Sequence, residues 1–216
     1  MKKIVQCWDD GVTSDIRLIE VLRRHGAKAS FNLNPGLHPR GEKAGGWKSG
    51  DREIRRLDHD MLVETYQGFT IANHTLTHPH LTKLSPAEIK REISEGRDQL
   101  QQLFQQPVRG FAYPFGNYDE EVMELLRASG HAYGRTVMNI KQPFPPGDPM
   151  AFHPTCHFLA EDFKKRYDMT EPDGVFYFWG HSFELHEEQD WAVFDEMIGW
   201  ISADPAAQWY SLEDLF

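Results

Sequence analysis

The chain has 216 residues and a formal net charge of −10, because 33 acidic residues outnumber 23 lysines and arginines. This length suits one domain with a proper core, and the acidic balance argues against nucleic acid as a partner. With two cysteines a disulfide scaffold is excluded, and no apolar run approaches the ~18 residues needed to span a membrane. The apolar run at the N-terminus stops at Asp9 and Asp10, so we predict no export signal and a cytoplasmic protein.

Segments typical of strands and helices alternate along the chain. Short runs without a helical period predict strands at residues 3–8, 28–33, 69–72, 109–113, 131–137, 152–157, 174–179 and about 209–210. Stretches with helical patterning or capping signals predict helices at residues 14–25, 61–67, 85–105, 119–129, 161–168 and 191–200. The clearest helix begins at Ser85-Pro86-Ala87-Glu88, a capping box with proline at the first helical position.

This alternation predicts an α/β fold with parallel strands and helices packed outside them. Seven or eight such units would close as a small, distorted (β/α) barrel, and we expect one such domain over residues 1–216. An open, doubly wound sheet is the competing architecture. Residues 34–60 are polar and glycine-rich, and because this stretch is too long for an ordinary connection we predict a functional loop there.

Chemically reactive side chains directly follow several of the predicted strands. These groups are Asp9-Asp10-Gly11, the histidine-rich run 73–80, Pro114-Phe115-Gly116 and Gly180-His181-Ser182. In a β/α barrel the carboxyl ends of the strands form the active rim, so we expect these groups to converge although they lie far apart in sequence.

The spacing of two histidines suggests a metal site. His74 and His78 are spaced i, i+4, which on a helical turn places both imidazoles on one face. With one carboxylate they make an ordinary site for a divalent metal, with positions left open for water and substrate. Capping or core histidines are the alternative interpretation.

The adjacent aspartates Asp9 and Asp10 support the same site. Two neighbouring carboxylates at a buried strand end repel each other, so we expect a cationic group beside them. A helix N-cap would account for one of them but hardly for both.

Three motifs together resemble those of a known family. Cys7-Trp8-Asp9-Asp10-Gly11, His74-Thr75-Leu76-Thr77-His78-Pro79 and Ala112-Tyr113-Pro114-Phe115-Gly116 are similar to the first three motifs of the polysaccharide deacetylases, also called the NodB-homology domain or carbohydrate esterase family 4. Trp179-Gly180-His181-Ser182 lies where the last histidine motif of that family is expected. The resemblance implies a distorted β/α barrel that holds one divalent metal, often zinc, with Co, Ni, Mn or Fe as alternatives.

The resemblance also implies roles for individual residues. Asp10, His74 and His78 would bind the metal, and Asp9 would be the general base that takes a proton from metal-bound water. His181 would be the general acid for the leaving amine. A further implied role is that of the backbone N–H of Phe115, which would help to stabilise the oxyanion. These roles agree with amide hydrolysis, which needs an activated water, oxyanion stabilisation and an acid.

The sequence departs from the family pattern at two places. Ala112 stands where members often carry an arginine that pairs with the base aspartate, and we propose Arg135 on the next strand as its replacement. The fourth motif is not recognisable, and the His153–His157 segment lies in that part of the sequence. Candidate substrate contacts, besides surface or packing roles, are Tyr113, Pro114, Trp47, His153 and His157.

The sequence therefore predicts a metal-dependent hydrolase that removes an acyl group, most simply N-acetyl, from a carbohydrate such as an intracellular sugar or oligosaccharide. A cyclic amide or ureide hydrolase and an O-acetyl esterase are close alternatives on the same fold. Two more distant ones are a non-haem iron enzyme, because two histidines and a carboxylate also suit ferrous oxygenases, and an inactive sugar-binding domain.

Overall fold

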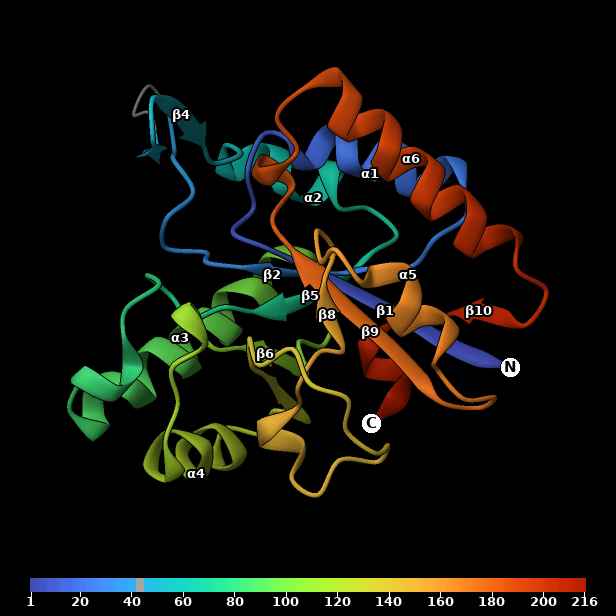
Figure 1. Cartoon of the computed structure of the whole chain (residues 1–216). Helices are drawn as coiled ribbons and strands as arrows, with labels where there is room; N and C mark the ends of the chain where they lie inside the picture. Colours follow the sequence, from blue (N-terminus) through green and yellow to red (C-terminus); the bar gives the residue numbers. More distant parts are fainter. Residues whose placement is uncertain (42–44) are drawn as a thin grey trace.

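The computed structural model describes residues 1–41 and 45–216, and a curled parallel sheet lies at the centre of this part of the chain (Figure 1). Its eight strands are β1 (Lys2–Asp9), β2 (Ser30–Leu33), β5 (Thr70–Asn73), β6 (Gly110–Ala112), β7 (Tyr133–Arg135), β8 (Cys156–His157), β9 (Val175–Gly180) and β10 (Ala207–Trp209). They lie in the order β7-β6-β5-β2-β1-β9-β8, and β10 also pairs with β1. The end of β1, which carries Asp9 and is followed directly by Asp10, therefore lies between β2 and β9.

The two ends of the sheet approach each other through the segment 152–157. Phe152 forms a parallel bridge with Arg135 on β7, and β8 pairs with β9. The predicted distorted barrel is thus confirmed, in place of an open doubly wound sheet. The strand predicted over 152–157 is present in part: Phe152 bridges β7, the segment from Thr155 to His157 bonds to β9, and Pro154 between them has no N–H to donate to a ladder.

Six α-helices pack outside the sheet in the described part of the chain: α1 (Asp15–Arg24), α2 (Leu62–Thr65), α3 (Pro86–Phe104), α4 (Glu120–Ala128), α5 (Phe163–Asp168) and α6 (Glu188–Ala203). Helix α1 packs beside α6, and α3 beside α4 (Figure 1). Helix α2 is shorter than predicted, and α6 begins earlier than predicted. No helix in the described ranges combines the length and the apolar character that crossing a membrane requires.

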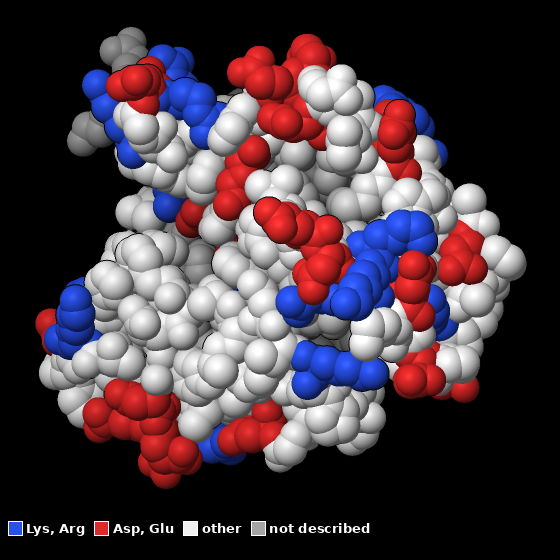
Figure 2. Space-filling view, in the orientation of Figure 1, with Lys and Arg blue, Asp and Glu red and all other residues white. Residues whose placement is uncertain are grey.

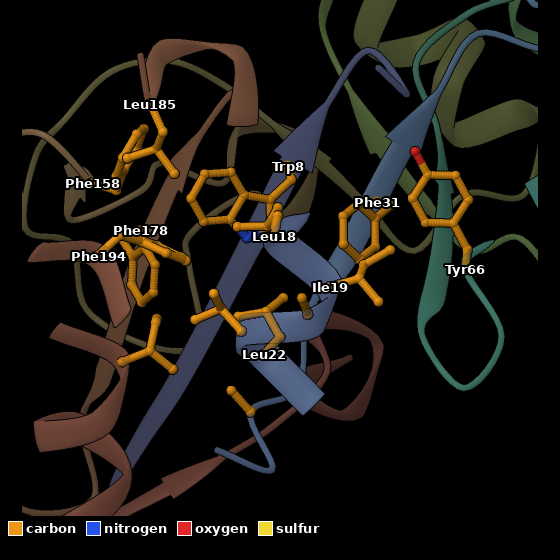
Figure 3. Close-up of a cluster of buried hydrophobic side chains, with 14 of the residues drawn as sticks. Trp8, Leu18, Ile19, Leu22, Phe31, Tyr66, Phe158, Phe178, Leu185 and Phe194 are labelled. Atoms are coloured by element: carbon orange, nitrogen blue, oxygen red, sulfur yellow. The ribbon is translucent and has the colours of Figure 1, made fainter. Parts of the chain in front are cut away.

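Alternation along β1 separates the core from the site. Trp8 points toward the helices, where its ring lies 5.0 Å from that of Phe158 and 5.4 Å from that of Phe194 (Figure 3). Helix α1 adds Leu18, Ile19 and further apolar side chains to this cluster. Because successive strand residues point to opposite faces, the next residue, Asp9, points into the barrel. Burial of large aromatic side chains on the helix side therefore fixes the register that presents Asp9.

The predicted loop over residues 34–60 contains regular structure that the sequence analysis missed. Strands β3 (Gly46–Ser49) and β4 (Arg52–Arg55) form an antiparallel hairpin, which stands apart from the main sheet in Figure 1. The hairpin is tied to the turn after β1, because Leu57 donates its N–H to the Gly11 carbonyl at 2.9 Å. A short 3₁₀ turn follows at His59–Met61. The strands of the hairpin are only four residues long, so their alternating pattern is too short to be distinguished from a glycine-rich loop in the sequence.

Candidate active site

A cleft of about 590 Å³ opens at the carboxyl ends of the strands, beside the β3–β4 hairpin. Figure 2 shows a hollow beneath this hairpin, with charged groups inside it. The residues that line the cleft are Asp9, Asp10, Trp47, Arg56, His74, His78, Tyr113, Phe115, Arg135, Val137, Trp179, His181 and Phe183. Side chains from all four motif regions of the sequence thus meet in one cleft.

The predicted metal ligands lie together at the floor of the cleft. One ligand atom each from Asp10, His74 and His78 lies within 4.8 Å of the others. The Nε2 atoms of the two histidines are 3.2 Å apart, and Nε2 of His78 is 3.9 Å from Oδ1 of Asp10. These are the nitrogen and oxygen donors that divalent cations such as zinc take in proteins.

A turn, not a helix, brings the two histidines together, which corrects the helical reading of their spacing. Thr75 and His78 both have positive φ, at 68° and 57°, and the N–H of His78 donates to Oγ1 of Thr75 at 2.9 Å. Asp10 also has a positive φ of 81°. Such conformations cost energy in residues other than glycine, and their concentration here marks a backbone held in place for its side chains.

Hydrogen bonding and burial prepare the histidines to bind a cation. The Nδ1–H of His74 donates to the Ala112 carbonyl at 2.7 Å, which leaves the Nε2 lone pair facing His78. Burial lowers the pKa of His74. Burial also lowers the pKa of His78, and the neighbouring His74 adds to this effect, so that the pKa of His78 falls to about 3. Both rings are therefore neutral at pH 7, the form in which imidazole binds a metal.

Asp9 has the cationic partner that the sequence analysis expected. The Arg135 guanidinium donates to both of its carboxylate oxygens, and Nδ2 of Asn32 donates to Oδ1 at 2.7 Å. Burial alone would raise the pKa of Asp9, but the charge of Arg135, with the nearby histidines and Asn32, holds it well below its usual range. Arg135 is the register partner of Ala112 on the neighbouring strand. The arginine absent at Ala112 is thus replaced from the adjacent strand.

Arg56 is a cleft residue that the sequence analysis missed. It is nearly buried, donates to the backbone carbonyl of Asp10 and to Oδ1 of Asn34, and has Nη2 3.4 Å from Oδ1 of Asp10. Its guanidinium lies 5.0 Å from the centre of the Trp47 ring. Each aspartate of the pair therefore has its own arginine, Asp9 on the inner side and Asp10 on the hairpin side.

His181 faces both aspartates across the cleft. Its Nε2 lies 3.8 Å from Oδ2 of Asp9 and 3.9 Å from Oδ2 of Asp10. On the other side of the ring, Oε2 of Glu184 lies 3.2 Å from Nδ1, and it also accepts a bond of 2.9 Å from the N–H of His181. Burial alone would lower the pKa of His181, but Glu184 and the two aspartates raise it above its ordinary value.

Glu184 has a second histidine as a partner. Nε2 of His157 lies 3.0 Å from the same Oε2 atom, and Nδ1 of His157 accepts the N–H of Leu159 at 3.3 Å. This bond assigns the His157 proton to Nε2, where it points at Glu184. His157 is not part of the cleft wall, and Glu184 connects it to the cleft residue His181.

Phe115 lies beside the metal-ligand set. It has a positive φ of 57°, its ring centre is 4.5 Å from that of His78, and it stacks on His80 at 3.9 Å. Asn117 contacts the far side of His80, with Nδ2 2.9 Å from Nδ1. The residue predicted to donate its N–H to an oxyanion therefore lines the cleft next to a predicted ligand.

The remaining candidates for substrate contact divide into two groups. Trp47 and Tyr113 line the cleft, although the Tyr113 hydroxyl donates away from it, to the Met150 carbonyl at 2.8 Å. Pro114 is buried and does not line the cleft. His153 lies in the wall of a separate cavity of about 270 Å³, with Nδ1 2.6 Å from Oγ1 of Thr136. The irregular backbone around Pro154 directs His153 away from the cleft.

The fold and the site together define a β/α-barrel protein whose strand ends gather a two-histidine, one-carboxylate set, a separate aspartate–arginine pair and a histidine bonded to a glutamate. The family model described as "Polysaccharide deacetylase" matches residues 1–134. The chain belongs to the polysaccharide deacetylase family.

Individual relatives agree with this assignment. The chain is 26% identical over 137 residues to the putative polysaccharide deacetylase YxkH of Bacillus subtilis, across 63% of this chain and 45% of that protein. It is 32% identical over 82 residues to a chitooligosaccharide deacetylase of Rhizobium leguminosarum, across 38% of this chain and 34% of that protein. The chain thus spans less than half the length of these relatives.

A solved structure supports the fold over nearly the whole chain. A family 4 carbohydrate esterase from Bacillus anthracis superposes with a TM-score of 0.65 at 16% identity, and the match covers 99% of this chain and 82% of that one. At this level of identity, the similarity concerns the barrel alone.

Proposed function

We propose that this protein is a metal-dependent hydrolase that removes an acyl group, most simply N-acetyl, from a carbohydrate. The observation that carries the proposal is the meeting of Asp9, the Asp10–His74–His78 set and His181 in one cleft. The names of relatives, among them a chitooligosaccharide deacetylase, point to the same substrate class. The cytoplasmic location remains a prediction.

The residues Asp10, His74 and His78 would hold the cation, and their mixture of imidazole and carboxylate fits zinc, with Co, Ni, Mn or Fe as alternatives. When bound there, a divalent cation supplies a lowered pKa for a bound water and a positive charge for the amide oxygen. The neutral state of both histidines and the bond from His74 to Ala112 support this assignment.

Asp9 would accept the proton of the attacking water. Arg135 keeps its carboxylate charged at neutral pH, and the bonds from Arg135 and Asn32 fix its orientation. A base must be ionised and aimed at the water before reaction, and these contacts provide both conditions.

His181 would donate a proton to the leaving nitrogen. The raised pKa favours its protonated form, and Glu184 holds the ring with Nε2 toward the cleft. The N–H of Phe115 would stabilise the negative oxygen of the tetrahedral intermediate. The partly exposed aromatic ring of Trp47 offers a face against which a sugar ring packs, whereas the Tyr113 ring is fully buried.

The proposal is tested with the purified chain and a panel of acetylated sugars, by measuring released acetate and bound metal. We expect about one divalent ion per chain, lost in Asp10→Asn and in His74→Ala. Retained stoichiometry in both variants would overturn the metal site. Adding O-acetyl sugars and cyclic amides or ureides to the panel distinguishes N-deacetylation from these alternatives, and acetate release from none of the sugars contradicts the proposed activity.

A further inference from the structure

Several large apolar side chains are exposed on segments that carry cleft residues or contact them. Phe115, Met138, Ile140 and Leu159 are 53%, 47%, 45% and 54% accessible to solvent. They come from three different connections, those that follow β6, β7 and β8. Side chains of this kind are normally scattered singly over a surface, so a group of them beside a cleft calls for a ligand.

Trp179, which lines the cleft, joins these segments. Its Nε1–H donates to Oδ1 of Asn139 at 2.8 Å, and Asn139 lies between Met138 and Ile140 in the chain. On its other side the Trp179 ring lies 4.9 Å from that of His157, whose Nδ1 accepts the N–H of Leu159. The segments that carry Met138, Ile140 and Leu159 are therefore tied to a residue of the cleft wall.

We call the group formed by Phe115, Val137, Met138, Ile140, Leu159 and Trp179 the apolar ledge. Phe115, Val137 and Trp179 belong to the cleft wall itself, and the other three are exposed on segments tied to it. The surface beneath the hollow in Figure 2 is largely uncharged, whereas Lys48, Arg52 and Arg55 of the hairpin above the hollow are exposed. The mouth of the cleft thus has one charged side and one apolar side.

We propose that the natural substrate is an amphiphile, in which the acetylated sugar enters the cleft and an attached apolar chain lies along the ledge. The proposal rests on the proposed function and names its substrate class. Met138, Ile140 and Leu159 have no ring on which a sugar can stack, so further sugar units gain little from them. An alkyl chain gains from contact with aliphatic side chains, because both lose apolar surface to water.

Continuity with the cleft favours a chain attached to the substrate over a second protein. The ledge begins at residues that line the cleft, so a group attached to a sugar in the cleft reaches it directly. A second copy of the chain seated there would instead cover the mouth and hinder access to Asp9 and His181.

The test compares methyl and octyl glycosides of N-acetylglucosamine, with octyl glycoside below its micelle concentration and acetate release as the measurement. We expect kcat/KM for the octyl glycoside to exceed that for the methyl glycoside by about tenfold or more. In the triple variant Met138→Ser, Ile140→Ser, Leu159→Ser the ratio should fall to about one. Val193→Ser, which removes an equally exposed apolar side chain from α6, should leave the ratio as in the wild type.

A wild-type ratio of about one overturns the amphiphile proposal and leaves the deacetylase proposal intact. If neither glycoside is hydrolysed, binding to the ledge is tested with octyl glucoside, which has no acetyl group. The binding is measured as a change in Trp fluorescence. Binding that the triple variant loses supports the ledge, and absence of binding overturns it. Ultracentrifugation tests self-association. If the wild type forms a concentration-dependent dimer that the triple variant does not form, and the alkyl chain changes neither kcat/KM nor binding, the ledge is an interface between copies of the chain and the proposal is overturned.

Discussion

Asp9 in the floor of the cleft and Asp15 at the start of α1 are 2% and 0% exposed, yet the pKa values of these two buried carboxyl groups are shifted in opposite directions. We call the surroundings of Asp9 the charged region and those of Asp15 the neutral region. Asp9 faces the guanidinium of Arg135, and its pKa lies well below the usual range. Among the described residues, the side chains bonded to Asp15 are the hydroxyls of Ser182 and, at 2.5 Å, Tyr66, and burial raises the pKa of Asp15 to about 7. A nearby cation therefore decides which carboxylate stays charged.

The two regions meet at His181. The His181 ring faces Asp9. The hydroxyl of the next residue, Ser182, donates to Asp15, and its Oγ lies 2.7 Å from Oγ of Ser14. The charged region contains the proposed base, whereas the neutral region holds the turn that carries the proposed acid. This division predicts different consequences when each carboxylate is replaced.

Replacement of Asp9 should give the largest loss of activity. Asp9→Asn keeps the shape but removes the proton acceptor, so we expect kcat to fall by about 10²–10⁴ while bound metal is retained. Asp15→Asn, the matched change in the neutral region, should lower kcat less than about tenfold. Acetate release and metal analysis of the two variants check this, and equal losses would contradict the assignment of Asp9 as the base.

Removal of the cation should destabilise the charged region. Arg135→Met leaves Asp9 buried without its partner, which we expect to cost about 3–5 kcal/mol in the free energy of unfolding of the metal-free protein. The double variant Asp9→Asn, Arg135→Met should recover part of this loss. Arg127→Met breaks a largely exposed ion pair with Asp148 and should cost at most about 1 kcal/mol in the same urea titrations. A similar small loss for Arg135→Met would mean that the ion pair is not needed to hold Asp9.

Arg56 tests whether the second arginine positions Asp10. Because Arg56 donates to the Asp10 backbone carbonyl, at a residue with positive φ, Arg56→Met should lower metal affinity about 10–100-fold. Arg55→Met, at an exposed neighbour paired with Glu53, is the control. Competition with a metal indicator measures the affinity. A tighter complex in Arg56→Met would show instead that the arginine charge mainly opposes the cation.

Glu184 should set the pH range of the proposed acid. Loss of its charge in Glu184→Gln lowers the pKa of His181, so the protonated acid is lost at lower pH and the alkaline limb of the kcat profile should move to lower pH. We expect kcat at pH 8 to fall about tenfold. Glu188→Gln, at an exposed pair with Arg17, should leave the profile in place. An unmoved alkaline limb in Glu184→Gln would separate Glu184 from the acid.

The residues within short motifs could be predicted from the sequence, because a strand end and the turn after it place neighbouring residues together. Asp9, His74 and His181 needed only the barrel topology to converge. Arg135 followed from its position on the strand beside Ala112. Such predictions depend on local order and on strand adjacency, which alternation along the chain reveals.

Arg56 could not be predicted in this way. Its place depends on how the β3–β4 hairpin docks on the turn after β1, through bonds such as Leu57 to Gly11 and Thr13 to Arg55. The same holds for the contact of His157 with Glu184 and for the position of His153, which lie on an irregular segment. Tertiary docking, not local pattern, decides where these side chains point.

The neutral region provides a distinct signature in the pH dependence of stability. Below the ordinary Asp pKa of 3.8, Asp15 is protonated in both the folded and the unfolded state. Between that value and about 7 the folded state keeps a proton that the unfolded state releases, so the free energy of unfolding falls with rising pH, by up to about 1.4 kcal/mol per unit. Above about 7 this contribution changes no further.

Asp15→Asn removes this titration and keeps groups that can bond Ser182 and Tyr66. We therefore expect the variant to gain stability relative to the wild type as pH rises from about 5 to about 7, and the difference to level off above that. Urea titrations of both proteins across this range measure it. If the two stability curves run parallel, Asp15 is charged in the folded protein, and the contrast with Asp9 does not depend on the missing cation.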